Sequence, residues 1–139
     1  MELQMKLCLG LALFTTIAAE STQSFKDGVE PHLKKCMEKV VDATEDDFNA
    51  VYNRNPLETH SARCLLKCLY GELDALLPDG RIKSGDDLMP IMEKLYGFKE
   101  FKTVMRTQIV NQCVDMVNSG EARDCELASD LIHCVMQHY

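Results

Sequence analysis

The 139-residue sequence has no tryptophan, and aromatic residues make up only 6% of it. Any apolar partner that the chain encloses would therefore meet mainly aliphatic and thioether side chains. Methionine, of which six lie beyond residue 19, suits such partners because it is flexible and polarizable. Alternating runs of β-branched residues between turns are also missing, which argues against β-strands. The sequence therefore favours an all-α protein.

Catalytic motifs are missing as well. The sequence contains no G-x-S-x-G elbow, no glycine-rich phosphate loop and no H-E-x-x-H helix. A secreted phospholipase A2, which is also helical and disulfide-rich, would need a His-Asp pair beside a cysteine and a glycine-rich calcium loop, and neither is present. The histidines share no common spacing: His32, His60, His133 and His138. We therefore expect a protein that is not an enzyme.

Positive charge is scarce relative to negative charge. The chain has 15 Lys and Arg residues against 22 Asp and Glu residues, so its formal net charge is −7 at pH 7. Proteins bind nucleic acids and anionic membranes mainly through Lys and Arg. The composition therefore argues against nucleic acid as a partner, and the acidity favours solubility.

Long apolar runs are confined to the N-terminal region. An apolar and small-residue run of about 13 residues extends from Leu7 to Ala19, and polar residues follow it. This run is shorter than the roughly 20 residues that a membrane-spanning helix needs, but it fits a secretory signal peptide. We expect residues 1–19 to be a signal peptide, cut after Ala18 or Ala19. Residues 20–139 should then form one secreted, extracellular domain without membrane insertion.

Apolar residues in this domain recur at three- and four-residue steps, the spacing of amphipathic helices. We predict six helices with short connections, over residues 25–40, 45–54, 61–77, 84–96, 101–117 and 124–139. Pro31 predicts a kink or break in the first helix, because proline lacks the backbone donor that a helix interior needs. Thr44 and Ser84 are predicted to begin helices, and Gly97 to end one.

Signal-peptide removal would take away Cys8 and leave an even number of cysteines: Cys36, Cys64, Cys68, Cys113, Cys125 and Cys134. An even count in a secreted chain indicates disulfides. Cys64 and Cys68 are four residues apart on one predicted helix, so they face the same side and are poorly oriented to bond each other. Each must reach a different neighbour, but spacing alone leaves the pairing open. A metal site formed by this pair with His60 would lack the second close ligand pair of typical zinc sites. We therefore expect no metal and no cofactor.

The gaps between the six cysteines are, in order, x27, x3, x44, x11 and x8. This ordered set resembles that of the insect odorant-binding proteins, and the similarity extends over about residues 20–139. The resemblance implies the bridges Cys36–Cys68, Cys64–Cys125 and Cys113–Cys134. It also implies a compact six-helix domain in which three interlocked disulfides enclose an apolar cavity. Each bridge is worth about 3–4 kcal/mol in chain entropy, so the centre of the fold need not be packed solid.

The resemblance further implies that the protein carries small hydrophobic molecules through aqueous fluid, in a pocket enclosed by its helices. We take candidate lining residues from the inner faces of the predicted helices and add the terminal tyrosine as a lid: Tyr70, Leu73, Leu76, Met89, Met92, Met105, Ile109, Leu131, Val135 and Tyr139. An aliphatic pocket of this kind should reject charged ligands, because burying an unpaired charge is costly.

We therefore expect an extracellular carrier of odorants or pheromones, whose partner is a small hydrophobic ligand. A membrane chemoreceptor is a further candidate partner, and we expect a monomer or a weak homodimer. Two alternatives fit the same framework: a carrier in a non-olfactory secretion, and a disulfide-stapled protein-interaction factor without a small ligand. The tissue of expression distinguishes the non-olfactory carrier from an olfactory one. Displacement of a fluorescent hydrophobic probe by apolar ligands distinguishes either carrier from the interaction factor.

Overall fold

The computed structural model describes residues 25–96, 107–121 and 124–137. Most of these residues are helical: residues 25–39, α2 (Glu45–Tyr52), α3 (His60–Glu72), α4 (Gly85–Tyr96), α6 (Thr107–Ser119) and α7 (Cys125–Met136). Within the described residues no strand forms, and a single isolated bridge pairs Leu76 with Ile82. The predicted all-α fold is confirmed. In the same residues, no helix is both long and apolar enough to cross a membrane.

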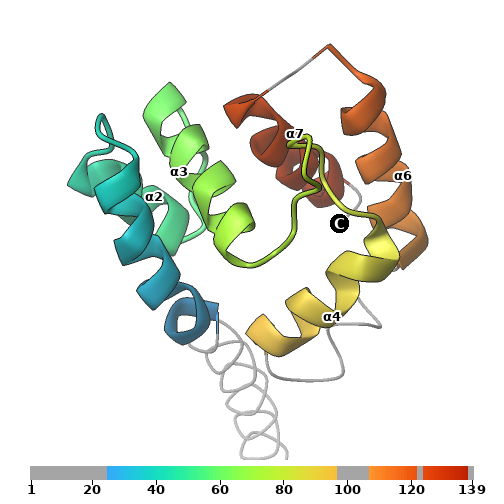
Figure 1. Ribbon diagram of the computed structural model, residues 1–139, viewed down its shortest axis with the longest axis horizontal. Coiled ribbons are helices and arrows are strands. Elements are labelled where there is room, and N and C mark those ends of the chain that lie inside the picture. The colour runs from blue at the N-terminus through green and yellow to red at the C-terminus, as the bar shows by residue number, and fades with distance from the viewer. Residues whose placement is uncertain (1–24, 97–106, 122–123, 138–139) are drawn as a thin grey trace, which may run out of the picture.

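The helices surround a common apolar core. α3 and α7 pack side by side, α2 packs against α3, and α6 packs against α7 (Figure 1). α4 packs against α6 and extends toward the helix of residues 25–39, where a Cβ added to Gly28 would lie 2.9 Å from Leu95 (Figure 1). Val29, Leu33 and Leu65 are among the fully buried side chains of the core. Burial of these apolar stripes holds the helices together.

Three disulfides link four of the helices in series: Cys36–Cys68 from the helix of residues 25–39 to α3, Cys64–Cys125 from α3 to α7, and Cys113–Cys134 from α7 to α6. The bridged Cα atoms lie 5.8, 4.5 and 5.7 Å apart, within the usual range for disulfides. These pairs are the ones that the resemblance implies, and Cys64 and Cys68 do reach different helices.

One buried carboxylate joins the N-termini of α2 and α3. Asp47 is 4% exposed and accepts hydrogen bonds from the backbone N–H of Thr44 (3.0 Å) and from the hydroxyls of Thr59 (2.6 Å) and Ser61. Thr44 and Thr59 are the N-caps of the two helices, so capping and tertiary contact use the same groups. Burial raises the pKa of Asp47, but the hydrogen bonds outweigh burial and hold the pKa below its ordinary value.

α3 ends earlier than the sequence predicts. It stops at Glu72 rather than at residue 77, because Asp74 adopts the left-handed conformation (φ 60°) and the N–H of Ala75 turns back to the carbonyl of Tyr70. Aspartate tolerates that conformation better than most residues. Leu76 therefore lies in the connection between α3 and α4, opposite Ile82, and not on a helix face.

Pro31 does not break the first helix, since residues 25–39 are helical throughout. Pro31 is exposed, whereas Val29 and Leu33 on either side of it are fully buried, and their burial offsets the lost backbone hydrogen bond. Ser84 caps α4 as predicted, because its hydroxyl accepts from the N–H of Asp87. The predicted cap at Gly97 and the predicted start of the fifth helix lie outside the described residues.

Candidate functional site

An apolar cavity of about 40 Å³ lies between α3, α4, α6 and α7. Only apolar atoms face it, and they come from these four helices and the connection after α3: Tyr70, Leu73, Ala75, Leu88, Ile91, Met92, Val110, Leu131, Ile132 and Val135. An ionic group would find no partner inside such a cavity, and burying an unpaired charge is costly. The cavity therefore suits uncharged, apolar groups.

Helical periodicity explains how the chain assembles this lining. Leu88, Ile91 and Met92 are spaced i, i+3 and i+4 on α4, so they share one face. Leu131 and Val135 have the same i, i+4 relation on α7. Three of the walls are covalently joined, because the Cys64–Cys125 bridge connects α3 to α7 and the Cys113–Cys134 bridge connects α7 to α6.

Half of the candidate lining residues predicted from the sequence face the cavity: Tyr70, Leu73, Met92, Leu131 and Val135. Three others do not line it. Leu76 lies in the connection after α3, Met89 is buried in α4 without lining the cavity, and Ile109 is half-buried one position before Val110. Met105 and Tyr139 lie outside the described residues. That any of these side chains contacts a ligand stays a prediction.

Sequence reasoning missed five lining residues: Ala75, Leu88, Ile91, Val110 and Ile132. Leu88 and Ile91 share the apolar stripe of Met92, so the periodicity of α4 could have found them. Val110 and Ile132 each adjoin a position that was already assigned to an inner face. Helical periodicity could not have found Ala75, because this residue lies in the connection that follows the end of α3.

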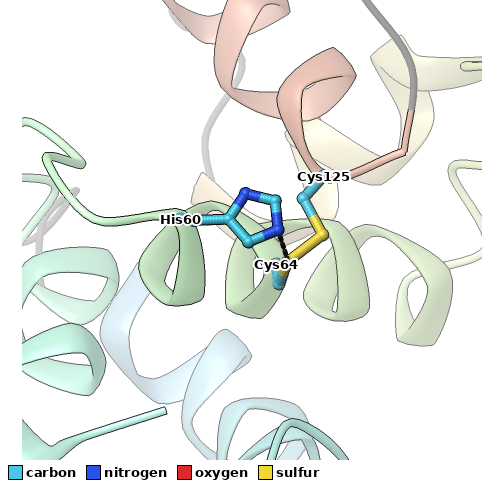
Figure 2. Close-up of side chains that lie close together, drawn as sticks. All are labelled: His60, Cys64 and Cys125. Atoms are coloured by element: carbon cyan, nitrogen blue, oxygen red, sulfur yellow. Dashed lines mark hydrogen bonds between the residues drawn. A yellow bond between two sulfur atoms is a disulfide. The ribbon is translucent and has the colours of Figure 1, made fainter. Parts of the chain in front are cut away.

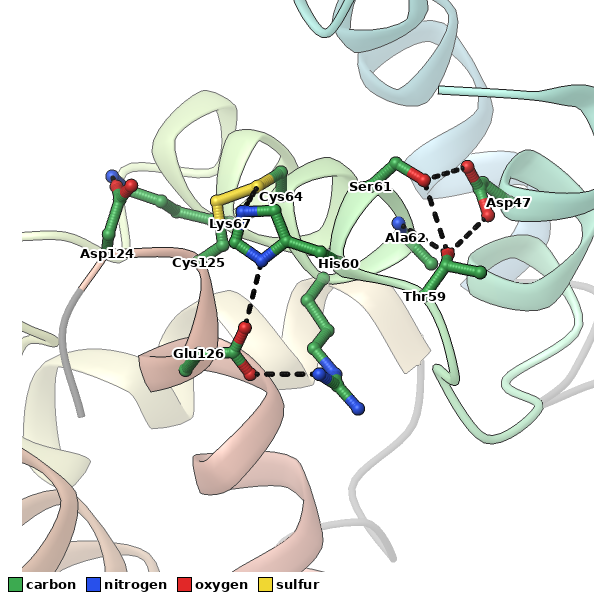
Figure 3. Close-up of a disulfide and its surroundings, with 11 residues drawn as sticks. Asp47, Thr59, His60, Ser61, Ala62, Cys64, Lys67, Asp124, Cys125 and Glu126 are labelled. Atoms are coloured by element: carbon green, nitrogen blue, oxygen red, sulfur yellow. Dashed lines mark hydrogen bonds and ion pairs between the residues drawn. A yellow bond between two sulfur atoms is a disulfide. The ribbon is translucent and has the colours of Figure 1, made fainter. Parts of the chain in front are cut away.

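A second cluster, of ionisable side chains, lies beside the Cys64–Cys125 bridge. Figure 2 shows the ring of His60 beside the disulfide, with Nε2 3.4 Å from the Sγ of Cys64. On the other side of the ring, Nδ1 lies 3.1 Å from a carboxylate oxygen of Glu126, whose second oxygen pairs with Arg63 at 3.3 Å. Figure 3 shows these contacts bridging α3 and α7.

Among the described residues, His60, Cys64 and Cys125 are the one group of three side chains close enough to hold a metal ion. The two sulfurs are bonded to each other, however, and a metal requires deprotonated thiolates as ligands. His60 is also largely exposed. The donor set therefore does not fit a metal in the disulfide-bonded protein, and the cluster instead holds α3 against α7.

The chain is similar to one known protein family and to solved structures of insect binding proteins. The family model described as the PBP/GOBP family matches residues 18–138. No curated protein sequence matches significantly. A solved structure of a pheromone binding protein from the cockroach Leucophaea maderae, in complex with the fluorescent reporter ANS, is similar at 47% identity and a TM-score of 0.76. The similarity covers 84% of this chain and 97% of the cockroach chain.

An odorant-binding protein from Drosophila melanogaster is similar in fold, with a TM-score of 0.56. Its identity is 19% over 79% of this chain and 91% of that chain, which speaks for the shared fold alone. The family match covers nearly the whole chain, and the cockroach structure adds high identity over most of it. With this match, and with three disulfides that link the helices of its described residues, the chain belongs to the PBP/GOBP family.

Proposed function

We propose that the protein carries small hydrophobic molecules, odorants or pheromones, through an aqueous extracellular fluid. The observation that carries this proposal is the cavity, which only apolar atoms face and which lies among helices held by disulfides. Membership of a binding-protein family and the ANS complex of the cockroach relative support it. Carriage of this kind requires no catalytic group, in keeping with a protein that is not an enzyme.

The energetics favour apolar ligands. Each CH₂ group moved from water into the cavity contributes about 0.8 kcal/mol. An apolar cavity of about 150 Å³ holds benzene, whereas this one measures about 40 Å³. The lining must therefore move apart before a ligand of that size can enter.

The three disulfides fit an oxidising, extracellular environment. We propose that residues 1–19 are a signal peptide that directs secretion and that residues 20–139 form the carrier. Expression of the full chain in a secreting host tests this directly. N-terminal sequencing of the secreted protein should begin at residue 19 or 20, and retention of residues 1–19 would contradict it.

Binding is tested with the oxidised, secreted protein and ANS as the probe. We expect ANS fluorescence to rise on binding and to fall again when a long-chain aliphatic alcohol is added. A short-chain aliphatic alcohol with the same head group serves as the matched control and should displace ANS less well, because each CH₂ group that it lacks removes about 0.8 kcal/mol of transfer free energy. Absence of any ANS binding that the long-chain alcohol displaces would contradict the carrier proposal and favour an interaction factor.

A further inference from the structure

Among the described helices that line the cavity, α4 is the one that no disulfide joins to another helix. The other walls, α3, α6 and α7, are joined by Cys64–Cys125 and Cys113–Cys134. α4 contains no cysteine, although it supplies Leu88, Ile91 and Met92 to the lining. Since the cavity must widen to admit a ligand, α4 is the wall that can move while every bridge stays intact.

Two asparagines of α6 hold the start of α4 and the segment before it. Asn118 pairs with both backbone groups of Ile82: its Oδ1 accepts from the N–H at 3.1 Å, and its Nδ2 donates to the carbonyl at 2.8 Å. About two turns nearer the N-terminus of α6, the Oδ1 of Asn111 accepts from the N–H of Gly85 at 2.6 Å. We call these three hydrogen bonds the asparagine clamp.

The packing around the clamp is close. A Cβ added to Gly85 would lie 2.8 Å from the Oδ1 of Asn111 and 2.9 Å from its backbone N, so only glycine fits there without a shift. All three hydrogen bonds are partly buried, and loss of a partner leaves a backbone group that water reaches poorly. The clamp therefore holds the start of α4 and the segment before it against α6.

We propose that Asn111 and Asn118 are positioning residues that set how fast a ligand enters and leaves the cavity. The clamp opens, α4 moves away from α6, the ligand passes, and the clamp closes again. This inference rests on the proposed carrier function. Because opening breaks hydrogen bonds that are worth about 0.5–1.5 kcal/mol each, removal of one side chain should speed exchange roughly three- to tenfold.

The test is stopped-flow measurement of ANS association and dissociation with the oxidised protein. We expect Asn118→Ala and Asn111→Ala to raise both rate constants roughly three- to tenfold, and to change the dissociation constant less than either rate. Asn111→Asp keeps the acceptor for Gly85, beside the N-terminus of α4, and should exchange ANS at the wild-type rate. Gln112→Ala, an exposed position of the same helix, is the matched surface control.

A second control separates positioning from general destabilisation. Thr44→Ala removes the cap of α2, away from the cavity, and should lower the thermal unfolding midpoint. If Thr44→Ala speeds ANS exchange as much as the asparagine variants do, or if the asparagine variants exchange at the wild-type rate, the clamp proposal is wrong. If the wild-type protein shows no displaceable ANS binding, the carrier function fails and the clamp proposal fails with it.

Hydrogen exchange of the wild-type protein tests the same proposal without any variant. The amides of α4 should exchange through a local opening, faster than those of α3 and α7, while all three disulfides remain intact. Exchange of α4 only through global unfolding would overturn the proposal, even if every asparagine variant failed to fold.

Discussion

Filling the cavity should stabilise the protein and weaken its ligand binding at the same time. Val110 lines the cavity, and Val114 lies one turn further along α6 without lining it. Both are 3% exposed, so the same substitution can be compared at two equally buried positions. Val110→Ile places one extra methyl group toward empty space, whereas Val114→Ile forces it into packed side chains.

The magnitudes follow from the cavity. Filling all 40 Å³ at about 24 cal/mol per Å³ would contribute about 1 kcal/mol, and one newly buried methyl group contributes at most about 0.8 kcal/mol. Val110→Ile should therefore raise the free energy of unfolding by several tenths of a kcal/mol. Val114→Ile should lower it by about 1–3 kcal/mol, since overpacking strains a filled core.

Val110→Ile should lower the affinity for ligand even though it raises the free energy of unfolding. One methylene group in an apolar pocket is worth about 1–3 kcal/mol, so Val110→Ile should weaken ANS binding about tenfold, while Val114→Ile leaves it near the wild-type value. Urea unfolding followed by circular dichroism, with the disulfides intact, gives the stabilities, and ANS titration gives the affinities. Equal shifts at the two positions, or unchanged affinity of Val110→Ile, would refute the assignment of this cavity as the binding site.

Three further predictions concern the framework around the cavity. Asp47→Asn should lower the free energy of unfolding by about 2 kcal/mol at pH 7, because charge-assisted hydrogen bonds are lost. The pKa of Asp47 in the folded protein lies below the unfolded value of about 3.9. The stability difference between wild type and Asp47→Asn should therefore persist above about pH 4 and vanish as pH falls through the folded pKa. Urea unfolding at a series of pH values measures the size of the difference and its pH dependence. Gly85→Ala should cost about 1–3 kcal/mol in thermal unfolding, because its Cβ meets the backbone of Asn111. Replacing both Cys64 and Cys125 with serine should cost about 4 kcal/mol in the same assay, since this bridge closes a separation of 61 residues; a cost below that of ordinary surface substitutions would contradict it.

Helix content and the disulfide framework were predictable because both depend on local or countable features. The apolar spacing predicts every helix that the described residues contain, and the same-face placement of Cys64 and Cys68 requires two different neighbours. Their partners came from the family resemblance, since spacing alone does not determine which helices are adjacent. The end of α3 was missed because Leu73 and Leu76 continue the helical spacing, and the pattern does not reveal that Asp74 turns left-handed.

The clamp was not predictable from the sequence. Asn118 and Ile82 are 36 residues apart, and an asparagine in the last turn of a helix normally reads as a solvent-exposed residue or a helix end. Only the packing of α4 against α6 brings its amide to a backbone pair. Half of the candidate lining residues face the cavity, and packing again explains why the others do not. Periodicity identifies the inner face of a helix, but the cavity forms only where neighbouring inner faces fail to meet.

The absence of cysteine from α4 separates two structural roles, the covalent framework and part of the cavity lining. Changes in the bridged helices alter both the folding framework and the cavity, because the same elements serve both. Changes at Leu88, Ile91 and Met92 reshape the cavity from a helix that no disulfide constrains. Substitutions in α4 can therefore change the shape of the cavity while the cysteine framework, and with it oxidative folding, stays the same.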